Sequence, residues 1–317
     1  SRLQDGLRVS GLPLAFAAAP PNLPVHVQLE LTWRCNWRCV HCYQDEHRGE
    51  ALDTARLGRL WRELRDAGCW HLILTGGEPL VRADFSALVE GARAAGLAIT
   101  LYTNGHLVDA ARAAWLTARI AAFEVTLLAG TAAVHDELSG VRGSFARSVR
   151  GLEALVAAGG SVLVKTPLLR PALPTLTALG ARLAELGVEW AADREIAASY
   201  AGAVSTQALA LDGAEWLRFI TDFPEQDPAR RSPRASDPGV QGGLCRAGRQ
   251  HAFIDALGNV YPCLSWKTPA DRLGRGRLGS LLEASFDALW RLSPVVAEIQ
   301  ALDRAAFATC ARCAAGA

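Results

Sequence analysis

The sequence has almost no excess of one charge, with 33 Lys and Arg against 32 Asp and Glu residues in 317. No electrostatic argument therefore favours nucleic acid or an anionic membrane as a partner. The chain also lacks an apolar run long enough to span a bilayer, because its apolar runs are strand-length and broken by Gly, Pro or charge. No signal peptide is visible. We expect a soluble, cytoplasmic protein that binds neither nucleic acid nor membrane.

The eight cysteines do not form the pattern of a disulfide framework. The chain is longer than disulfide-stapled miniproteins, and a reducing cytoplasm opposes such bonds. Three cysteines cluster near residue 40, four lie between residues 245 and 313, and Cys69 stands alone. This distribution predicts two metal centres and one ordinary buried thiol.

From residue 25 onward, strand-like runs alternate with helical stretches, several of which end at glycine. Alternation of this kind favours a parallel sheet with right-handed crossovers, and six units are too few for a complete eight-stranded barrel. The expected fold is α/β, a partial (β/α)6 TIM-like barrel with a small C-terminal metal-binding module. The expected strands are Val25–Thr32, His71–Gly76, Ala98–Thr103, Phe123–Leu128, Ser161–Pro167 and Glu189–Ile196. The expected helices are Thr54–Ala67, Asp84–Ala95, Val108–Thr117, Phe145–Ala158 and Pro174–Leu186.

The sequence divides into four expected regions. Residues 1–24 form an N-terminal arm, 25–200 the partial barrel, 201–244 a linker region with one helix around Trp216, and 245–317 the C-terminal module. The module carries a hairpin signal at Leu257-Gly258-Asn259 and a helix near Leu281–Leu292. The module has few large apolar residues, and its apolar core alone would be only marginally stable. We therefore expect a bound metal to stabilise this module.

Cys35, Cys39 and Cys42 follow the first expected strand at C-x₃-C-x₂-C spacing. Three thiolates on one loop would hold a four-iron cubane and leave one iron open to a small molecule. The alternative is a zinc knuckle, in which His41 or His47 would supply the fourth ligand.

This triad, followed by Thr75-Gly76-Gly77-Glu78-Pro79, resembles the radical S-adenosylmethionine (SAM) superfamily. The resemblance covers most of residues 25–200. It implies that Cys35, Cys39 and Cys42 bind a [4Fe-4S] cluster whose open iron chelates SAM. One-electron reduction then cleaves SAM to a 5′-deoxyadenosyl radical that abstracts a substrate hydrogen.

Several residues are candidate SAM ligands through the same resemblance. His41 would lie against the adenine, or else be a loop histidine bonded to backbone. Two glycines, Gly76 and Gly77, permit close approach of the backbone, and Glu78 could accept hydrogen bonds from the SAM ammonium. Asn104 could bond the ribose hydroxyls or form an Asx-turn.

Lys165 lies in the middle of an apolar strand, where an inward-facing lysine is costly unless it is paired. It is a candidate partner of the SAM carboxylate or of a substrate acid. The alternative is an ion pair with one of three acidic residues on other strands, namely Glu124, Asp193 and Glu195.

Cys245, Cys263, Cys310 and Cys313 form the second metal signal. Their spacing, with Gly258 ahead of Cys263, resembles the auxiliary-cluster domains called SPASM and, in shortened form, twitch. Four thiolates can hold one closed auxiliary [4Fe-4S] cluster, whereas a zinc ribbon is the alternative. Such a cluster implies electron transfer, either from a substrate radical or from a flavodoxin or ferredoxin donor.

The region from Cys245 to Cys263 looks most like maturases of ribosomally made peptides, which cross-link, epimerise or decarboxylate their substrates. The first 24 residues are too few for a leader-binding domain, so we expect either a separate leader-peptide-binding protein or a substrate that is not a peptide. The alternatives are a radical SAM enzyme of haem biosynthesis and a twitch-type alcohol dehydrogenase. No catalytic residue is assigned.

Overall fold

The computed structural model describes residues 8–9, 12–13, 23–44, 46–47, 49–199, 206–227, 246–267 and 276–302. Within these residues, one large sheet has nine strands in the order β11-β10-β9-β3-β4-β5-β6-β7-β8. A second, two-stranded sheet pairs β1 (Arg8–Val9) with β2 (Leu12–Pro13).

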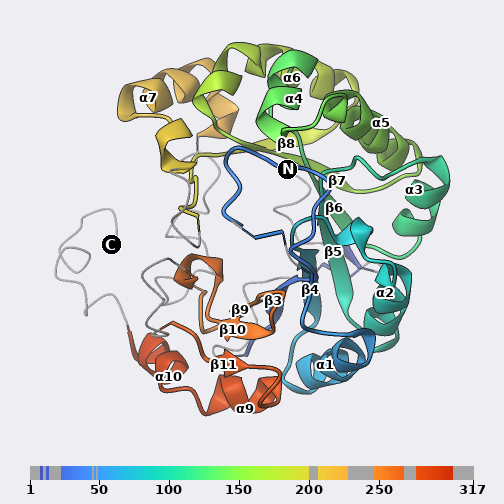
Figure 1. Ribbon diagram of the computed structural model, residues 1–317, viewed down its shortest axis with the longest axis vertical. Coiled ribbons are helices and arrows are strands. Elements are labelled where there is room, and N and C mark those ends of the chain that lie inside the picture. The colour runs from blue at the N-terminus through green and yellow to red at the C-terminus, as the bar shows by residue number, and fades with distance from the viewer. Residues whose placement is uncertain are drawn as a thin grey trace.

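Six neighbouring strands of the large sheet are parallel, as the alternation of elements predicts. They are β3 (His26–Glu30), β4 (His71–Thr75), β5 (Ala98–Thr103), β6 (Ala122–Thr126), β7 (Val162–Pro167) and β8 (Glu189–Asp193). The helices that connect them are α1 (Thr54–Asp66), α2 (Phe85–Ala94), α3 (Ala110–Thr117), α4 (Ala132–Ser139), α5 (Ser144–Ala157) and α6 (Leu176–Glu185). These helices form an outer arc around the strands, so the sheet curves as a partial barrel (Figure 1).

Helix α1 shows how the sequence specifies this arc. Asp53 accepts a hydrogen bond from the Arg56 backbone N–H and caps the first turn. Leu57, Leu60, Trp61 and Leu64 recur at helical spacing and are buried. Their burial holds the helix against the sheet, and the chain then reverses at Gly68, whose φ is +98°.

Helix α4 has no counterpart in the sequence-based prediction. Its eight residues contain few large apolar groups, and His135 and Ser139 are buried polar residues on it. The helix is held by tertiary contacts, since the His135 ring meets the Trp37 ring edge-on with centroids 5.2 Å apart. Tertiary context of this kind outweighs local propensity.

The predicted hairpin near Gly258 is present, formed by β9 (His251–Ile254) and β10 (Asn259–Tyr261). The carboxylate of Asp255 accepts hydrogen bonds from the backbone of Leu257 and Asn259 and so organises the turn. Strand β9 pairs in parallel with β3 and joins the large sheet. The sequence did not predict this junction, which places the C-terminal segment against the first strand of the barrel.

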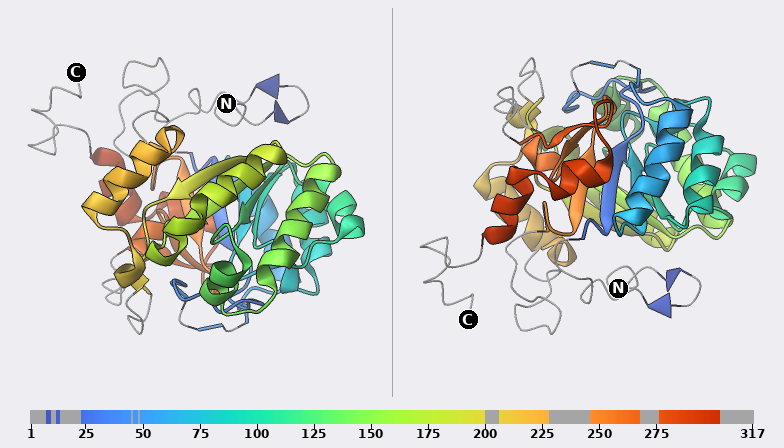
Figure 2. Two further views of the ribbon diagram at one scale, coloured as in Figure 1. Left: turned by 90° about the horizontal axis from the view of Figure 1, so that it is seen from above. Right: turned by 90° about the horizontal axis from the view of Figure 1, so that it is seen from below.

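The remaining C-terminal elements are β11 (Gly279–Ser280), α9 (Phe286–Arg291) and α10 (Pro294–Ala301). Strand β11 pairs with β10, α9 packs on helix α1, and α10 contacts the turn at Gly248. Glu63 of α1 accepts a hydrogen bond from the Phe286 backbone N–H at 2.8 Å, and Arg56 donates to the Leu281 carbonyl at 2.9 Å. Figure 2 shows these orange and red elements beside the blue strand β3 and helix α1.

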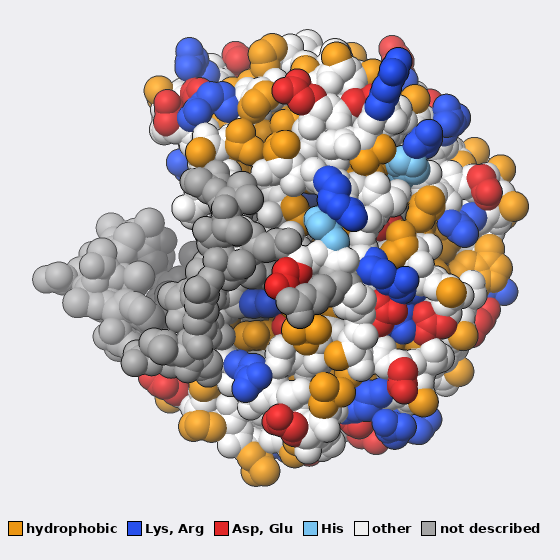
Figure 3. Space-filling model, viewed as in Figure 1, with side chains coloured by type: hydrophobic (Ala, Val, Ile, Leu, Met, Phe, Trp, Pro, Cys, Tyr) orange, Lys and Arg blue, Asp and Glu red, His pale blue; other side chains and the backbone are white. Residues whose placement is uncertain are grey.

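Within 206–227, the predicted helix around Trp216 is α7 (Gly213–Asp222), which begins with an Asp212–Glu215 capping box. Two short 3₁₀ helices, Thr206–Leu209 and Pro224–Gln226, flank it. Residues 201–205 and 228–244 of the predicted linker lie outside the described residues. No described helix has the length and apolar character needed to cross a membrane. Acidic and basic side chains are interspersed over the face in Figure 3, which fits the balanced charge of the sequence.

Candidate functional site

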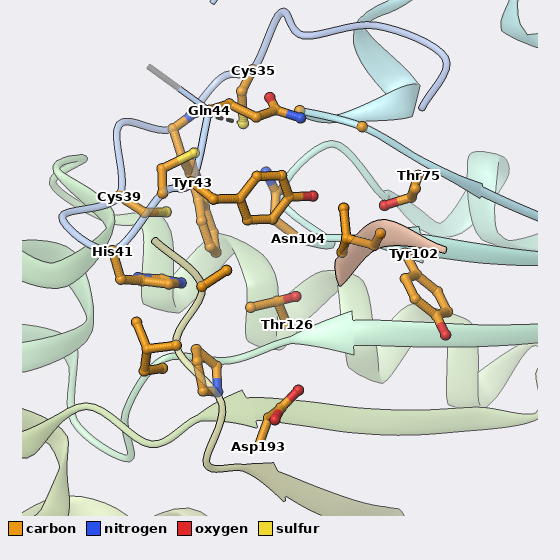
Figure 4. A pocket seen from close by; sticks show the side chains of 18 of the residues that line it. Cys35, Cys39, His41, Tyr43, Gln44, Thr75, Tyr102, Asn104, Thr126 and Asp193 are labelled. Carbon is orange, nitrogen blue, oxygen red and sulfur yellow. Dashed lines mark hydrogen bonds between the residues drawn. The ribbon is translucent and has the colours of Figure 1, made fainter. Parts of the chain in front are cut away.

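A cavity of about 600 Å³ lies at the carboxyl ends of the parallel strands, where α/β folds place their ligands. Figure 4 shows the cysteine loop on one side of it, and Tyr102, Thr126 and Asp193 on the other. A C-terminal loop that contains Ser265 and Lys267 also lines the cavity. Three distant parts of the chain therefore meet in one space.

Cys35, Cys39 and Cys42 are half-buried and all line this cavity. The loop that carries them is fixed from outside by α4, because the backbone N–H groups of Arg38 and Val40 donate to carbonyls at the end of that helix, at 2.9 and 3.0 Å. The structure thus brings together the three thiols that the sequence singled out.

Burial raises the pKa of the Cys35 thiol to about 12, and the nearby Glu78 and Cys42 also raise it. Burial likewise raises the pKa of Cys39, and Cys42 and Cys35 add to the effect. Three thiols so close together ionise only when a cation compensates their charge, as a metal centre does. This environment fits a thiolate-bound metal group.

No three His, Cys, Asp or Glu side chains in the described part of the chain are arranged to hold one metal ion. A four-iron cluster does not require that arrangement, since each thiolate binds a different iron. The zinc partners considered from sequence, His41 and His47, also line the cavity.

The glycine turn after β4 packs directly on the entry to the cysteine loop. Gly76 has a φ of +142°, and a Cβ there would lie 2.3 Å from the Thr32 carbonyl oxygen. A Cβ at Gly77 would lie 2.3 Å from the Arg34 carbonyl oxygen. Both glycines line the cavity. Glycine is required at these positions because the turn packs directly against the backbone of the cysteine loop.

Glu78 is fully buried and lies outside the residues that line the cavity. Its carboxylate accepts hydrogen bonds from Thr103 Oγ1, the Asn104 backbone and the Leu80 backbone, at 2.8, 2.8 and 3.1 Å. Burial raises its pKa to about 7. Glu78 thus joins the ends of β4 and β5, and its contact with a ligand ammonium stays a prediction.

Asn104 lines the cavity, and its side chain is engaged on both sides. Its Oδ1 accepts from the His106 backbone at 3.0 Å, which is the Asx-turn considered from sequence. Its Nδ2 donates to Asn36 Oδ1 in the cysteine loop at 2.7 Å. A contact with ribose stays a prediction.

His41 lines the cavity, and its Nδ1 is buried without a hydrogen-bond partner among the described residues. Burial lowers its pKa to about 4, so the ring is neutral at pH 7. A neutral ring with an unused nitrogen fits the predicted adenine contact, which the structure does not test.

Lys165 forms the ion pair that was the alternative to a ligand contact. Its Nζ lies 3.6 Å from Asp193 Oδ2, and Asp193 lines the cavity whereas Lys165 does not. Glu124 also faces the cavity, and burial raises its pKa while Lys165 lowers it. The wall opposite the cysteine loop is therefore acidic.

Of the four C-terminal cysteines, Cys263 is described and half-buried; Cys245, Cys310 and Cys313 lie outside the described residues. Just after Cys263, Lys267 extends towards β3, with Nζ 3.5 Å from Glu30 Oε2 and 3.2 Å from Asp255 Oδ2. Its ammonium also lies 4.5 Å from the centroid of the Trp33 ring.

Sequence reasoning missed Glu30, Tyr43, Gln44 and Lys267, which form one buried network beside the cysteine loop. One signal was available: Glu30 is the only carboxylate in the expected strand Val25–Thr32, and a buried carboxylate needs partners. The partners themselves lie far along the chain, and only the β3–β9 junction brings Lys267 to it.

Comparison with known proteins identifies two domains. The radical SAM superfamily matches residues 29–175, and the iron–sulfur cluster-binding domain SPASM matches residues 245–314. Mycofactocin maturase MftC of Mycobacterium ulcerans is 29% identical over 297 residues, which cover 88% of this chain and 78% of that protein. An AdoMet-dependent heme synthase of Oleidesulfovibrio alaskensis is 34% identical over 150 residues, or 46% of this chain and 38% of that protein.

Among solved structures, Streptococcus suis SuiB bound to precursor peptide SuiA matches with a TM-score of 0.69 and 16% identity. The match covers 89% of this chain and 67% of the SuiB chain. At this identity the likeness establishes a shared fold.

Proposed function

This chain is a radical SAM enzyme with a C-terminal SPASM domain, and on that premise we propose that it oxidatively modifies a ribosomally synthesised peptide. The observation that carries the proposal is the cavity in which three loop thiols, the parallel strand ends and the C-terminal loop meet. The match to a peptide maturase along most of both chains supports a peptide substrate. The haem-synthase matches are either short, at 34% identity over less than half of either chain, or less similar, at 26% identity over 77% of this chain, which makes haem biosynthesis the weaker alternative.

In this proposal Cys35, Cys39 and Cys42 hold a [4Fe-4S] cluster that binds SAM at its open iron. When bound, this group supplies a 5′-deoxyadenosyl radical by one-electron reductive cleavage. The chain's own residues enclose the reaction: Trp37 is 2% exposed behind the cysteine loop, and the Gly76-Gly77 turn fixes the loop from below. Enclosure excludes water from a reactive species.

The acidic wall is the expected site for the peptide. Glu124 and Asp193 lie across the cavity from the cysteine loop, and their carboxylates can accept hydrogen bonds from peptide N–H groups or from a basic side chain. Tyr102 bonds to Glu124 and sets its position.

Cys245, Cys263, Cys310 and Cys313 are proposed to hold one auxiliary [4Fe-4S] cluster. Four thiolates leave no open iron, so its role is to accept the electron of a substrate radical or to relay one from a flavodoxin or ferredoxin. In this proposal the enzyme works in the reducing cytoplasm, where oxygen-sensitive clusters and free thiols persist.

Anaerobic iron–sulfur reconstitution tests the cluster assignment. The intact protein is expected to hold about eight irons, and the triple variant C35A/C39A/C42A about four. Cys69→Ala is the matched control, because Cys69 is a buried free thiol that donates to the His71 carbonyl and should leave the iron content unchanged. Bound zinc and no 5′-deoxyadenosine after reduction would contradict the assignment.

The substrate class is tested with the reconstituted enzyme, SAM and a reductant. A short precursor peptide encoded beside this gene should give a modified peptide by mass spectrometry, with stoichiometric 5′-deoxyadenosine. Modification of a tetrapyrrole in place of the peptide would favour the haem alternative.

A further inference from the structure

Glu30, the last residue of β3, is a carboxylate surrounded by donors. It is 1% exposed. Its Oε1 accepts from Gln44 Nε2 at 3.0 Å and from the Tyr43 hydroxyl at 3.3 Å. Its Oε2 accepts from Trp33 Nε1 at 2.7 Å and lies 3.5 Å from Lys267 Nζ. Two of these donors, the indole N–H and the ammonium, have no accepting atom.

This arrangement fixes the orientation of the Gln44 amide. Burial raises the pKa of Glu30, but the Lys267 ammonium and the Trp33 and Gln44 donors oppose this rise and favour the ionised form. An ionised carboxylate only accepts hydrogen bonds, and Gln44 turns its NH₂ group towards Glu30. Its Oε1 then points away from Glu30. Gln44 is 4% exposed and lines the cavity, and its Oε1 has no hydrogen-bond partner within the described ranges. A buried acceptor in this state needs a donor.

The position of Gln44 identifies that donor. Gln44 follows Cys42 by two residues, and Glu30 is the register partner of Thr75, the residue before the glycine turn. The amide therefore lies where the cysteine loop meets the Gly76-Gly77 turn, and Gln44, both glycines, Thr75 and Cys42 line one cavity. Figure 4 shows Gln44 beside Cys35 and Tyr43 on this side. Glu78, the acceptor expected from sequence, is engaged elsewhere.

We propose that Gln44 binds the α-ammonium group of SAM through Oε1, with Glu30 as the positioning residue that holds the amide in that orientation. The inference rests on the proposed function, because SAM is the ligand assigned there. The Glu30 carboxylate polarises the amide through its NH₂ group and strengthens Oε1 as an acceptor for a cation. Lys267 holds Glu30 from the C-terminal segment, so the SAM site is completed by residues beyond the radical SAM domain.

The test measures SAM affinity by equilibrium dialysis on the reconstituted full chain, in wild type and in Gln44→Leu. Loss of the acceptor should weaken SAM binding on the order of tenfold. The SAM analogue without the α-amino group should bind wild type and Gln44→Leu alike, because it has no donor for Gln44. Gln207→Leu removes another cavity-lining glutamine outside the network, and it should bind SAM as wild type does.

Glu30→Gln tests the positioning role. A glutamine there can bond Gln44 in either amide orientation, so SAM binding should weaken while binding of the amino-free analogue stays the same. The effect should not add to that of Gln44→Leu. Circular dichroism and melting of each variant report whether it folds.

Two results would overturn the inference. One is equal weakening of SAM and the amino-free analogue in Gln44→Leu. The other is unchanged SAM affinity in Gln44→Leu, and a raised KM for the peptide in that variant would then assign the donor to the substrate. If wild type itself does not bind SAM, the proposed function fails, and this inference fails with it.

Discussion

The Nδ1 atoms of His26 and His71 lie 2.9 Å apart on the neighbouring strands β3 and β4. A hydrogen bond between these two atoms contains one proton, so only one of the two rings carries a proton on Nδ1. His251 is the register partner of His26 on the other side, on β9. The three rings therefore form a row across the junction between the barrel and the C-terminal segment.

The first prediction is that acid weakens this junction. Burial lowers the pKa of His26 to about 3, and His71, His251 and Arg246 act in the same direction. Burial also lowers the pKa of His71 and of His251 to about 4, and a nearby cationic group adds to each effect. The unfolded chain binds these protons at about pH 6.5, so the unfolded state holds more protons between pH 6.5 and 4. The free energy of unfolding is therefore highest above pH 6.5 and decreases as the pH falls. The expected loss is on the order of 1–2 kcal/mol per histidine at pH 5.

Urea unfolding at pH 7, 6 and 5 measures this loss. The double variant His26→Asn/His71→Asn removes two of the titrating groups and should show a shallower dependence on pH. Equal slopes in the variant and in wild type would show that other groups cause the loss.

The second prediction concerns the glycine turn. Gly76→Ala should destabilise the protein by about 2 kcal/mol or more, because its φ of +142° is strained for alanine and the new Cβ would meet the Thr32 carbonyl oxygen. Displacement of that backbone should also reduce the iron held by the cysteine loop. Gly58→Ala is the control, since this residue lies in α1 with no atom within 4 Å of its added Cβ; it should be neutral or slightly stabilising. Unfolding and iron content check both variants.

The third prediction concerns Glu78 as a brace between β4 and β5. Glu78→Ala removes the acceptor of the Asn104 and Leu80 backbone N–H groups and of the Thr103 hydroxyl in a buried place. We expect a loss of about 2–4 kcal/mol in the free energy of unfolding. Glu90→Ala, at an exposed pair with Arg119, should change little. A Glu78→Ala protein as stable as wild type would contradict the bracing role.

The elements that carry their own sequence pattern were predictable. The strand at residues 98–103 and the helix at 54–66 combine apolar periodicity with caps or turns, and the structure has them at nearly the expected bounds. The cysteine loop was found because its spacing is unusual. Patterns of this kind involve residues that are close together in the chain, so a single sequence is enough to recognise them.

The contacts that could not be predicted join residues that are far apart in the sequence. Lys267 lies next to Glu30 only because β9 pairs with β3, and no local sequence pattern predicts that pairing. The role of Glu78 was similarly hidden, since its three donors come from both β5 and its own turn. Helix α4 is short and depends on its contact with the cysteine loop.

The last prediction concerns Lys267, whose ammonium lies between two carboxylates that are each 1% exposed, Glu30 and Asp255. Lys267→Met keeps much of the apolar stem but leaves both carboxylates without this cation. Removal of one partner of a buried ion pair costs about 3–5 kcal/mol, because the remaining charge is not compensated. Stability should be partly recovered in Lys267→Met/Glu30→Gln, which removes one of the two charges. Arg291→Met, at the exposed pair with Asp287, is the control and should have little effect. Chemical unfolding of the four proteins at pH 7 makes the comparison, and a Lys267→Met loss no larger than that of Arg291→Met would mean that the ammonium does not stabilise the two carboxylates.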